Sequence, residues 1–193
     1  MASALFDELA GATLKGPFPS TNEVRADSLW RDSTALIYVL RRAGCPFCRK
    51  FAVELMKRKG DFESTGARLI VIVSQEQGAE AFSLVSWKGG EVYIDEAERF
   101  KHRLGSRLSD HAHLLEPKVM YSAVEAAIAY GASFDDINNK SSLLGGELVV
   151  TRDQGIVFEY RETARFAHAN VDTLLDECRK ATDGEQCVGQ CEA

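Results

Sequence analysis

Two closely spaced cysteines, in the segment Cys45-Pro-Phe-Cys48, are the residues of this sequence best suited to chemistry. Pro46 suits the first position of a helix, because its missing N–H is not needed there and its φ is already helical. Cys45 is then the N-cap, where unsatisfied backbone N–H groups and the positive end of the helix dipole favour a thiolate. We therefore predict that Cys45 is the nucleophile and that Cys48, one turn deeper on the apolar face, is the resolving thiol.

Positive charge is concentrated around this pair of thiols. Between Arg41 and Lys59 the chain has seven basic residues and one acidic residue, although its net charge is −6. Arg41 and Arg42 lie just before Cys45 and are expected to lower its pKa further. The sequence thus predicts a redox-active thiolate in a locally positive environment.

Three further side chains are candidates for assisting such a thiolate. Arg161 and Arg165 follow a predicted hairpin, and a guanidinium suits an anionic transition state or a peroxide oxygen. His168 is a candidate proton donor to the leaving oxygen. For each of the three, the alternative is a solvated surface or capping position.

Other uses of cysteine and histidine remain open at this stage. The Cys-x-x-Cys spacing also suits half of a zinc site or a short structural disulfide, but no second pair lies nearby in the sequence. Cys187 and Cys191 could pass electrons to the helix thiols, bind zinc together with Cys178, or have no role. His111 and His113 lack a third ligand, and no glycine-rich phosphate loop is present in the sequence. We therefore expect neither a metal nor a nucleotide cofactor.

These candidates need elements that position them. Residues 34–40 and 68–74 are continuous apolar runs, typical of strands buried on both faces. Apolar residues at four-residue spacing predict a helix from Phe47 to Gly60 between them, so this part is expected to be a parallel β-α-β unit. Residues 146–151 and 156–160 predict an antiparallel hairpin. The other predicted elements are helices at 3–14, 75–86, 96–104, 118–130 and 171–181 and a short strand at 91–94.

Length and composition set the expected domain organisation. The 193 residues, of which 45% are hydrophobic and 27% charged, predict a single globular domain at 1–182 and a flexible, cysteine-bearing tail at 183–193. The irregular part at about 105–145 is interpreted as an insertion. No apolar run is long enough to span a membrane, and the negative net charge argues against nucleic-acid binding. The N-terminus lacks the pattern of a signal peptide, so we expect a cytoplasmic protein.

A β-α-β unit followed much later by β-β-α, with Cys-x-x-Cys at the start of the first helix, is the thioredoxin arrangement. We predict an α/β, thioredoxin-like fold: a central mixed sheet flanked by helices, with a helical insertion before the C-terminal β-hairpin. Several segments resemble the peroxiredoxin-like 2 family in their order along the chain. They are Leu40-Arg-Arg-Ala-Gly-Cys-Pro-Phe-Cys-Arg49, Val92-Tyr-Ile-Asp95, Leu144-Gly-Gly-Glu-Leu-Val-Val150, and Tyr160-Arg-Glu followed by His168-Ala169.

This family belongs with the alkyl hydroperoxide reductase and thiol-specific antioxidant proteins and includes prostamide/prostaglandin F synthase. The resemblance implies an oxidoreductase that reduces peroxides or lipid endoperoxides and is reset by an external dithiol donor such as thioredoxin. Peroxiredoxins have Pro-x-x-x-Thr-x-x-Cys at the active site. Here Cys45 stands at the Thr position, and in that register Cys48 would attack the peroxide. Protein dithiol–disulfide exchange and a non-catalytic redox-sensing role are the alternatives.

Overall fold

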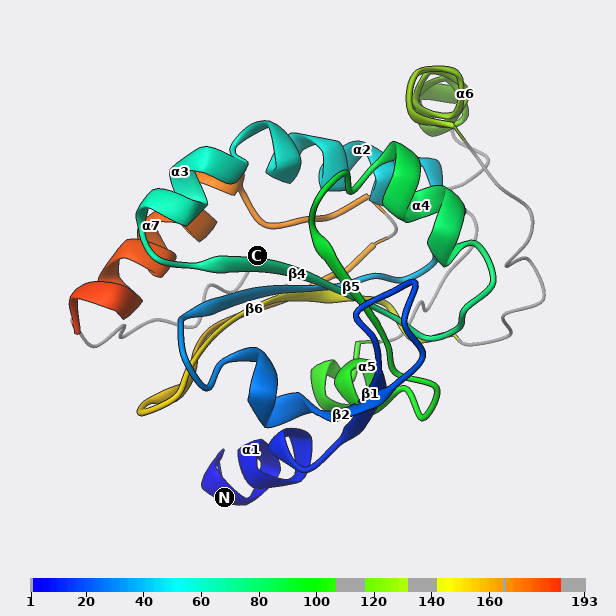
Figure 1. Ribbon diagram of the computed structural model, residues 1–193. Helices are drawn as coiled ribbons and strands as arrows, with labels where there is room; N and C mark the ends of the chain where they lie inside the picture. Colours follow the sequence, from blue (N-terminus) through cyan, green and yellow to red (C-terminus); the bar gives the residue numbers. More distant parts are fainter. Residues whose placement is uncertain (1, 107–116, 132–141, 165, 185–193) are drawn as a thin grey trace.

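The computed structural model describes residues 2–106, 117–131, 142–164 and 166–184. The described residues form one seven-stranded sheet in the order β2-β1-β5-β4-β3-β6-β7, with helices on both faces (Figure 1). The strands are β1 (Thr13–Lys15), β2 (Glu23–Arg25), β3 (Ala35–Val39), β4 (Arg68–Val73), β5 (Glu91–Ile94), β6 (Gly146–Thr151) and β7 (Gly155–Arg161). The helices are α1 (Ala2–Ala10), the short 3-10 helix η1 (Ala26–Leu29), α2 (Pro46–Lys57), α3 (Lys59–Ser64), α4 (Ala79–Val85), α5 (Arg99–Leu104), α6 (Pro117–Tyr130) and α7 (Val171–Asp183).

The predicted α/β arrangement with a mixed sheet is confirmed. Strand β3 pairs in parallel with β4, and β4 in parallel with β5. On its other side β3 pairs antiparallel with β6, which continues into the β6–β7 hairpin. The crossover from β3 to β4 runs through α2 and α3, so the carboxyl end of β3 leads directly into the start of α2. This connection positions the two cysteines.

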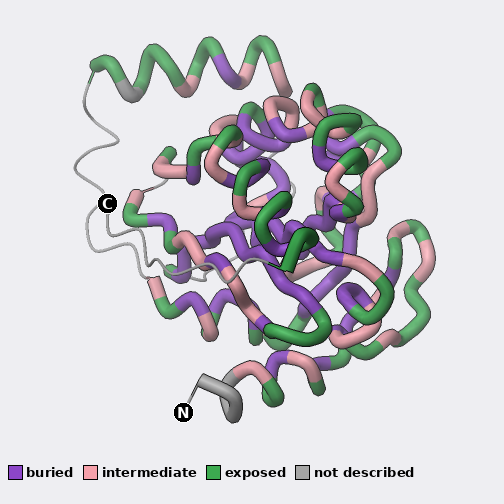
Figure 2. The backbone as a smooth tube through the Cα atoms, turned by 90° about the vertical axis from the view of Figure 1, so that its left-hand side faces the viewer, coloured by how far each residue is buried: buried purple, intermediate pink, exposed green. Residues whose placement is uncertain are grey.

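Alternating side chains of β3 face two apolar layers. Leu36 and Tyr38 belong to the layer under α2, α3, α4 and α7, and Ile37 and Val39 to the layer that contains residues of α1, η1 and α5. Figure 1 shows these two groups of helices on opposite faces of the sheet, and Figure 2 shows the buried residues concentrated between them. A strand that is covered on both faces needs an uninterrupted apolar sequence, which explains the run that predicted it.

The predicted helix at 3–14 is wrong beyond Ala10. There the chain forms β1, and β2 follows in the stretch that the sequence indicated as a polar connection. Strand β1 pairs antiparallel with both β2 and β5. Three-residue strands carry almost no periodic signal of their own, because their stability comes from pairing with a strand far away in the sequence.

Three other helices differ from their predicted bounds. The helix expected at 75–86 begins only at Ala79, after Gly78, whose φ of 80° is left-handed. The helix expected at 96–104 begins at Arg99, because the Asp95 side chain accepts a hydrogen bond from the Phe100 backbone N–H at 2.9 Å. The helix expected from Phe47 to Gly60 is divided into α2 and α3 at Arg58. Local periodicity does not report such loop contacts and backbone conformations, so the observed helix bounds differ from the predicted ones.

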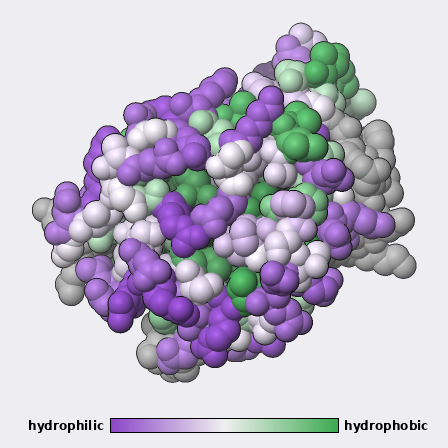
Figure 3. Space-filling model, in the orientation of Figure 1, coloured by the Kyte–Doolittle hydropathy of each residue, from purple (hydrophilic) through white to green (hydrophobic). Residues whose placement is uncertain are grey.

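Within the predicted insertion, the helix expected at 118–130 is confirmed as α6, which lies beside α2. Figure 3 shows apolar side chains at the surface in this part of the molecule, and Met120, Tyr121, Val124 and Ile128 are all exposed. The rest of the insertion at 107–116 and 132–141, and the tail at 185–193, lie outside the described residues. His111, His113, Arg165, Cys187 and Cys191 therefore have no structural account here. Among the helices in the described part of the chain, none has the length and apolar character needed to cross a bilayer.

Candidate active site

The two thiols lie at the start of α2, where the sequence places them. Cys45 is the N-cap, with φ −71° and ψ 123°, and Pro46 opens the helix. Both side chains are buried, since Cys45 is 6% and Cys48 0% exposed. Cys48, the third residue of α2, therefore faces the apolar layer, and Cys45, the N-cap, lies just beneath the surface.

The pKa values of the two thiols move in opposite directions. The pKa of Cys45 is held well below its ordinary value, chiefly by the hydrogen bond that the Cys48 thiol donates to it. Burial opposes this shift, whereas the positive charge and hydrogen bond of Arg41 and the Cys48 backbone N–H add to it. The same sulfur–sulfur hydrogen bond, together with burial, raises the pKa of Cys48 well above its ordinary value. These shifts in pKa favour a thiolate at Cys45 and a protonated thiol at Cys48.

The guanidinium that faces the thiols belongs to Arg41. Its side chain is buried, and although burial lowers its pKa, the charges of Cys48 and Cys45 offset this and leave the pKa above its ordinary value. The Arg41 carbonyl oxygen accepts a hydrogen bond from the buried Lys101 ammonium at 3.1 Å, which fixes the end of β3. Arg42 is half-buried and is not among the largest contributors to the pKa shift of Cys45.

Close backbone packing holds the segment between β3 and α2. The Arg49 side chain donates a hydrogen bond from Nε to the Ala43 carbonyl oxygen at 2.8 Å, and so ties α2 back to the preceding loop. A Cβ at Gly145 would lie 2.0 Å from the Val39 carbonyl oxygen. Only glycine allows β6 to approach the end of β3 so closely, and this brings the residues of β6 and β7 near the thiols.

A second group of polar side chains, Glu147, Glu162 and His168, is buried in the same region. Oε1 of Glu162 lies 3.1 Å and Oε1 of Glu147 lies 3.4 Å from Nδ1 of His168. The second carboxylate oxygens accept backbone hydrogen bonds, from Gly145 N–H to Glu162 at 3.1 Å and from Ala169 N–H to Glu147 at 3.4 Å. We call these three side chains the Glu-Glu-His cluster.

Aromatic rings fix the orientation of His168. Its imidazole stacks on Phe51 of α2 at a centroid distance of 4.3 Å and an interplanar angle of 7°, and it meets Tyr38 of β3 edge-on at 5.8 Å. Burial lowers the pKa of His168, but the two carboxylates outweigh it and raise the pKa to about 10. Burial raises the pKa of Glu147 to about 7.

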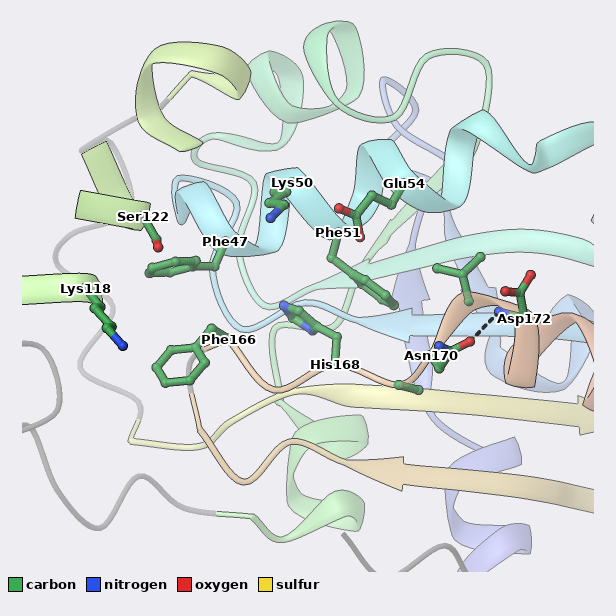
Figure 4. Close-up of a pocket in the computed structure, with 12 residues that line it drawn as sticks. Phe47, Lys50, Phe51, Glu54, Lys118, Ser122, Phe166, His168, Asn170 and Asp172 are labelled. Atoms are coloured by element: carbon green, nitrogen blue, oxygen red, sulfur yellow. Dashed lines mark hydrogen bonds between the residues drawn. The ribbon is translucent and has the colours of Figure 1, made fainter. Parts of the chain in front are cut away.

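A cavity of about 540 Å³ opens beside the start of α2. Figure 4 shows Phe47 and Phe166 at one end of this cavity, with His168 and Phe51 further along it. The rings of Phe47 and Phe166 are 5.8 Å apart. The cavity is lined by Phe47, Lys50, Phe51, Glu54, Lys118, Ser122, Phe166, His168, Ala169, Asn170, Val171 and Asp172. It combines aromatic walls with cationic side chains from α2 and α6, and Phe47 in its wall is one of the two residues between the two cysteines.

Sequence reasoning placed several of these residues and missed others. Arg161 lies at the end of β7, where its exposed side chain pairs with Glu159. Cys178 is fully buried in α7. Glu147 and Glu162 were not singled out as site residues, although a glutamate inside the apolar run 146–151 is a signal: an acidic side chain in a buried strand needs a partner.

Comparisons with solved structures show the class of fold. Among solved structures, the fold is similar to the bacterioferritin comigratory protein of Xanthomonas campestris, with a TM-score of 0.61 at 12% identity, covering 93% of this chain and 95% of that one. It is also similar to a peroxiredoxin 6 mutant of Arenicola marina, with a TM-score of 0.53 at 16% identity, covering 90% of this chain and 73% of that one. The fold is therefore that of the thioredoxin-like peroxiredoxins.

The sequence comparisons give the family. Residues 54–164 match the AhpC/TSA antioxidant enzyme family. The chain is 32% identical over 157 residues to the prostamide/prostaglandin F synthase of Danio rerio, covering 79% of this chain and 76% of that protein. It is 28% identical over 181 residues to the peroxiredoxin-like 2A of the same fish, covering 93% and 84%. This chain belongs to the AhpC/TSA antioxidant enzyme family, with the peroxiredoxin-like 2 proteins among its relatives, as the resemblance in sequence predicts.

Proposed function

We propose that this protein, as a peroxiredoxin-like thiol oxidoreductase, reduces peroxides or lipid endoperoxides through Cys45 and Cys48. The observation that carries the proposal is the position of the two thiols: Cys45 is the N-cap of α2 and Cys48 its third residue, both are buried next to Arg41, and their pKa values shift in opposite directions. The family match begins at residue 54, after both cysteines, so the role of the pair rests on this geometry. A thiolate next to a protonated thiol is the state that a nucleophile and a resolving cysteine need.

The proposed reaction has two steps. The Cys45 thiolate attacks one oxygen of the O–O bond, and the other oxygen leaves as an alkoxide and takes up a proton. A hydroperoxide gives a sulfenic acid and an alcohol in this step, whereas an endoperoxide gives a sulfenate ester, because the attacked oxygen stays bonded to the substrate carbon. The Cys48 sulfur then attacks the Cys45 sulfur and a disulfide forms. The Cys48 proton leaves with the hydroxide of the sulfenic acid as water, or with the alkoxide of the ester as a second alcohol group. An external dithiol, such as thioredoxin, reduces the disulfide and becomes oxidised itself.

Arginine side chains are proposed to assist the first step. Arg41 stabilises the Cys45 thiolate, because its buried guanidinium is the positive charge that lowers the pKa of this thiol. Arg42 and Arg161 remain the candidates named from the sequence. Arg42 is half-buried next to Arg41, and Arg161 would have to leave its ion pair with Glu159 to reach a substrate.

The cavity favours an organic peroxide over hydrogen peroxide as the substrate. Two aromatic rings, Phe47 and Phe166, offer contact area to an apolar chain, and Lys50 and Lys118 offer charge to an acidic group on it. A small, polar oxidant would gain nothing from these walls. The relative named prostamide/prostaglandin F synthase supports a lipid endoperoxide as one such substrate. The expected location is the cytoplasm, where reductants keep such a thiol pair reduced.

The test is turnover with purified protein, dithiothreitol or thioredoxin, and a panel of hydrogen peroxide, cumene hydroperoxide and a lipid endoperoxide. Catalytic loss of an organic peroxide that disappears in Cys45→Ser supports the proposal. Reduction of insulin disulfides without peroxide loss would instead indicate protein disulfide exchange. A stable Cys45–Cys48 disulfide with no turnover would indicate a redox sensor. Full activity in Cys45→Ser would refute the assignment of the nucleophile.

A further inference from the structure

The Glu-Glu-His cluster is expensive to bury and is not used by the proposed thiol chemistry. Both carboxylates are completely buried, and the His168 side chain is 9% exposed. Each unpaired ion taken out of water costs several kcal/mol, so two neighbouring carboxylates require compensating positive charge. One imidazolium supplies a single positive charge for two negative ones. Protonation of one carboxyl group would remove the excess negative charge, and a divalent cation with a neutral imidazole would compensate both carboxylates.

The atoms that face each other are not joined by well-formed hydrogen bonds. Oε1 of Glu147, Oε1 of Glu162 and Nδ1 of His168 are all buried without a hydrogen-bond partner of good geometry. Buried polar groups are nearly always paired, so three such atoms converging on one point indicate space for something that all three can bind.

The two nitrogen–oxygen distances in the cluster match those between ligands of a transition-metal ion. Bonds of about 2.0–2.1 Å from zinc to imidazole nitrogen and carboxylate oxygen give ligand–ligand distances of about 3.3 Å in a tetrahedral site. The two nitrogen–oxygen distances in the cluster are 3.1 Å and 3.4 Å, and all three ligand atoms lie within 4.8 Å of one another. An imidazole ligand favours zinc, iron, cobalt or nickel over calcium and magnesium, which prefer oxygen.

The surroundings of the three side chains resemble the supporting shell of a metal site. The second oxygens of Glu162 and Glu147 are oriented by the backbone N–H groups of Gly145 and Ala169. The His168 ring is held between Phe51 and Tyr38, and the same residue lines the cavity, which offers an entry path. Such outer contacts are what keep ligands in place before an ion arrives.

We propose that Glu147, Glu162 and His168 form a binding site for one divalent first-row transition ion, such as Zn²⁺. The ion would join β6, the end of β7 and the segment before α7, and so fix the part of the fold that supports the thiols. This inference does not depend on the peroxide chemistry, because neither carboxylate takes part in the proposed steps, and His168, which lines the cavity, is only a candidate proton donor in them.

The experiment must keep the metal away from the cysteines. We would use the full chain with Cys45, Cys48, Cys187 and Cys191 replaced by Ser, leaving only the buried Cys178. After treatment with a chelator, the protein is titrated with Co²⁺, and Zn²⁺ is then added to displace it. The expected result is saturation at one ion per chain, with the visible absorption of low-coordinate cobalt and without a thiolate charge-transfer band. The midpoint of thermal unfolding should rise with the ion concentration.

Variants then assign the ligands. Glu162→Gln and His168→Gln should each weaken binding by about a hundredfold or more, since loss of a supporting contact alone costs 10–100-fold. Glu159→Gln is the matched control, because Glu159 lies on β7 outside the cluster and pairs with Arg103 and Arg161. If either variant fails to fold, Glu147→Gln replaces it. The titration of the cysteine-depleted protein is decisive in any case.

Three results would overturn the proposal. The first is no saturable binding in the cysteine-depleted protein, which would mean that the cluster holds protons only. The second is binding that Glu162→Gln and His168→Gln leave unchanged. The third is binding only in protein that retains its cysteines, which would assign the ion to thiols. None of these results would affect the test of peroxide turnover in the unmodified chain, so the two proposals can fail independently.

Discussion

Replacing Arg41 tests the electrostatic basis of the proposed thiolate. In the variant Arg41→Gln the Cys45 sulfur loses a positive charge and the charged guanidinium donor, while the hydrogen bond from Cys48 is retained. Both losses disfavour the charged sulfur, so the pKa of Cys45 rises. Since the thiolate is the nucleophile, alkylation at neutral pH becomes slower.

The size of this effect follows from the burial of the pair. Arg41 is 8% and Cys45 6% exposed, so solvent screens their interaction little. A hydrogen bond to a charged group contributes about 1.5–3 kcal/mol. With about 1.4 kcal/mol for each pKa unit, the pKa of Cys45 should rise by about 1–2 units. Arg41→Lys keeps the charge but loses the planar donor geometry, and should cause a smaller rise.

The assay is the rate of iodoacetamide alkylation as a function of pH, followed by mass spectrometry of the peptide that contains Cys45. Peptide-level detection separates this thiol from the other cysteines. In the unmodified chain the midpoint should lie below that of an ordinary thiol, which is about 8.5. In Arg41→Gln the midpoint should move upward, and below it the rate should fall by about ten- to a hundredfold.

Arg42→Gln is the comparison variant, because it removes one positive charge from the neighbouring position. The alkylation midpoint of Arg42→Gln should rise by less than about a third of the rise in Arg41→Gln, since Arg42 is only half-buried and exposed charges are screened. Equal shifts in the two variants would mean that general positive charge, rather than the Arg41 contact, activates the thiol. A midpoint in the unmodified chain at or above that of an ordinary thiol would refute the reasoning altogether.

Three other measurements test separate parts of the structure. Cys48→Ala should raise the alkylation midpoint of Cys45 by about one pH unit, and Cys48→Ser should not, because only serine keeps a side-chain donor. Equal midpoints in the two variants would contradict the role of the hydrogen bond from Cys48. Phe166→Ala should lower kcat/KM for cumene hydroperoxide by about fivefold and leave kcat/KM for hydrogen peroxide unchanged. The reason is that a half-exposed ring provides about half of the burial energy of a phenylalanine. An equal fall for both substrates would exclude the cavity as the binding site. Gly145→Ala should lower the free energy of unfolding in urea by about 3 kcal/mol, because its Cβ would meet the Val39 carbonyl oxygen. Gly60→Ala is the control: no atom lies within 4 Å of its Cβ, so it should raise the free energy of unfolding by up to about 1 kcal/mol. Similar values for the two variants would show that the chain is not tightly packed at the start of β6.

The reach of sequence reasoning differed between the elements of the fold. The strands at residues 34–40 and 68–74 could be predicted because a strand buried on both faces must be apolar throughout. The short strands β1 and β2 could not be predicted, because they form by pairing with each other and, for β1, with the distant strand β5. The predicted helix bounds were wrong where a loop side chain, such as Asp95, accepts a hydrogen bond from the first turn, or where a left-handed glycine, such as Gly78, precedes the helix.

The candidate site shows the same division. The spacing of Cys45 and Cys48 and the proline between them predicted the helix start, because N-cap chemistry is local. Which of two adjacent arginines faces the thiols could not be predicted, since that depends on how β3 ends against Lys101 and β6. The Glu-Glu-His cluster was missed as a unit because its members come from three segments that only the hairpin and the start of α7 bring together.

The amino-acid sequence by itself determined the sheet core, the thiol pair at a helix N-terminus and the family resemblance, because each depends on residue types at short spacing. Only the tertiary structure decided that Arg41 faces Cys45, that an aromatic cavity opens beside Phe47, and that two buried carboxylates meet His168. Some of these contacts join residues that lie more than a hundred positions apart in the sequence. Their energies depend on burial, which only the complete fold creates.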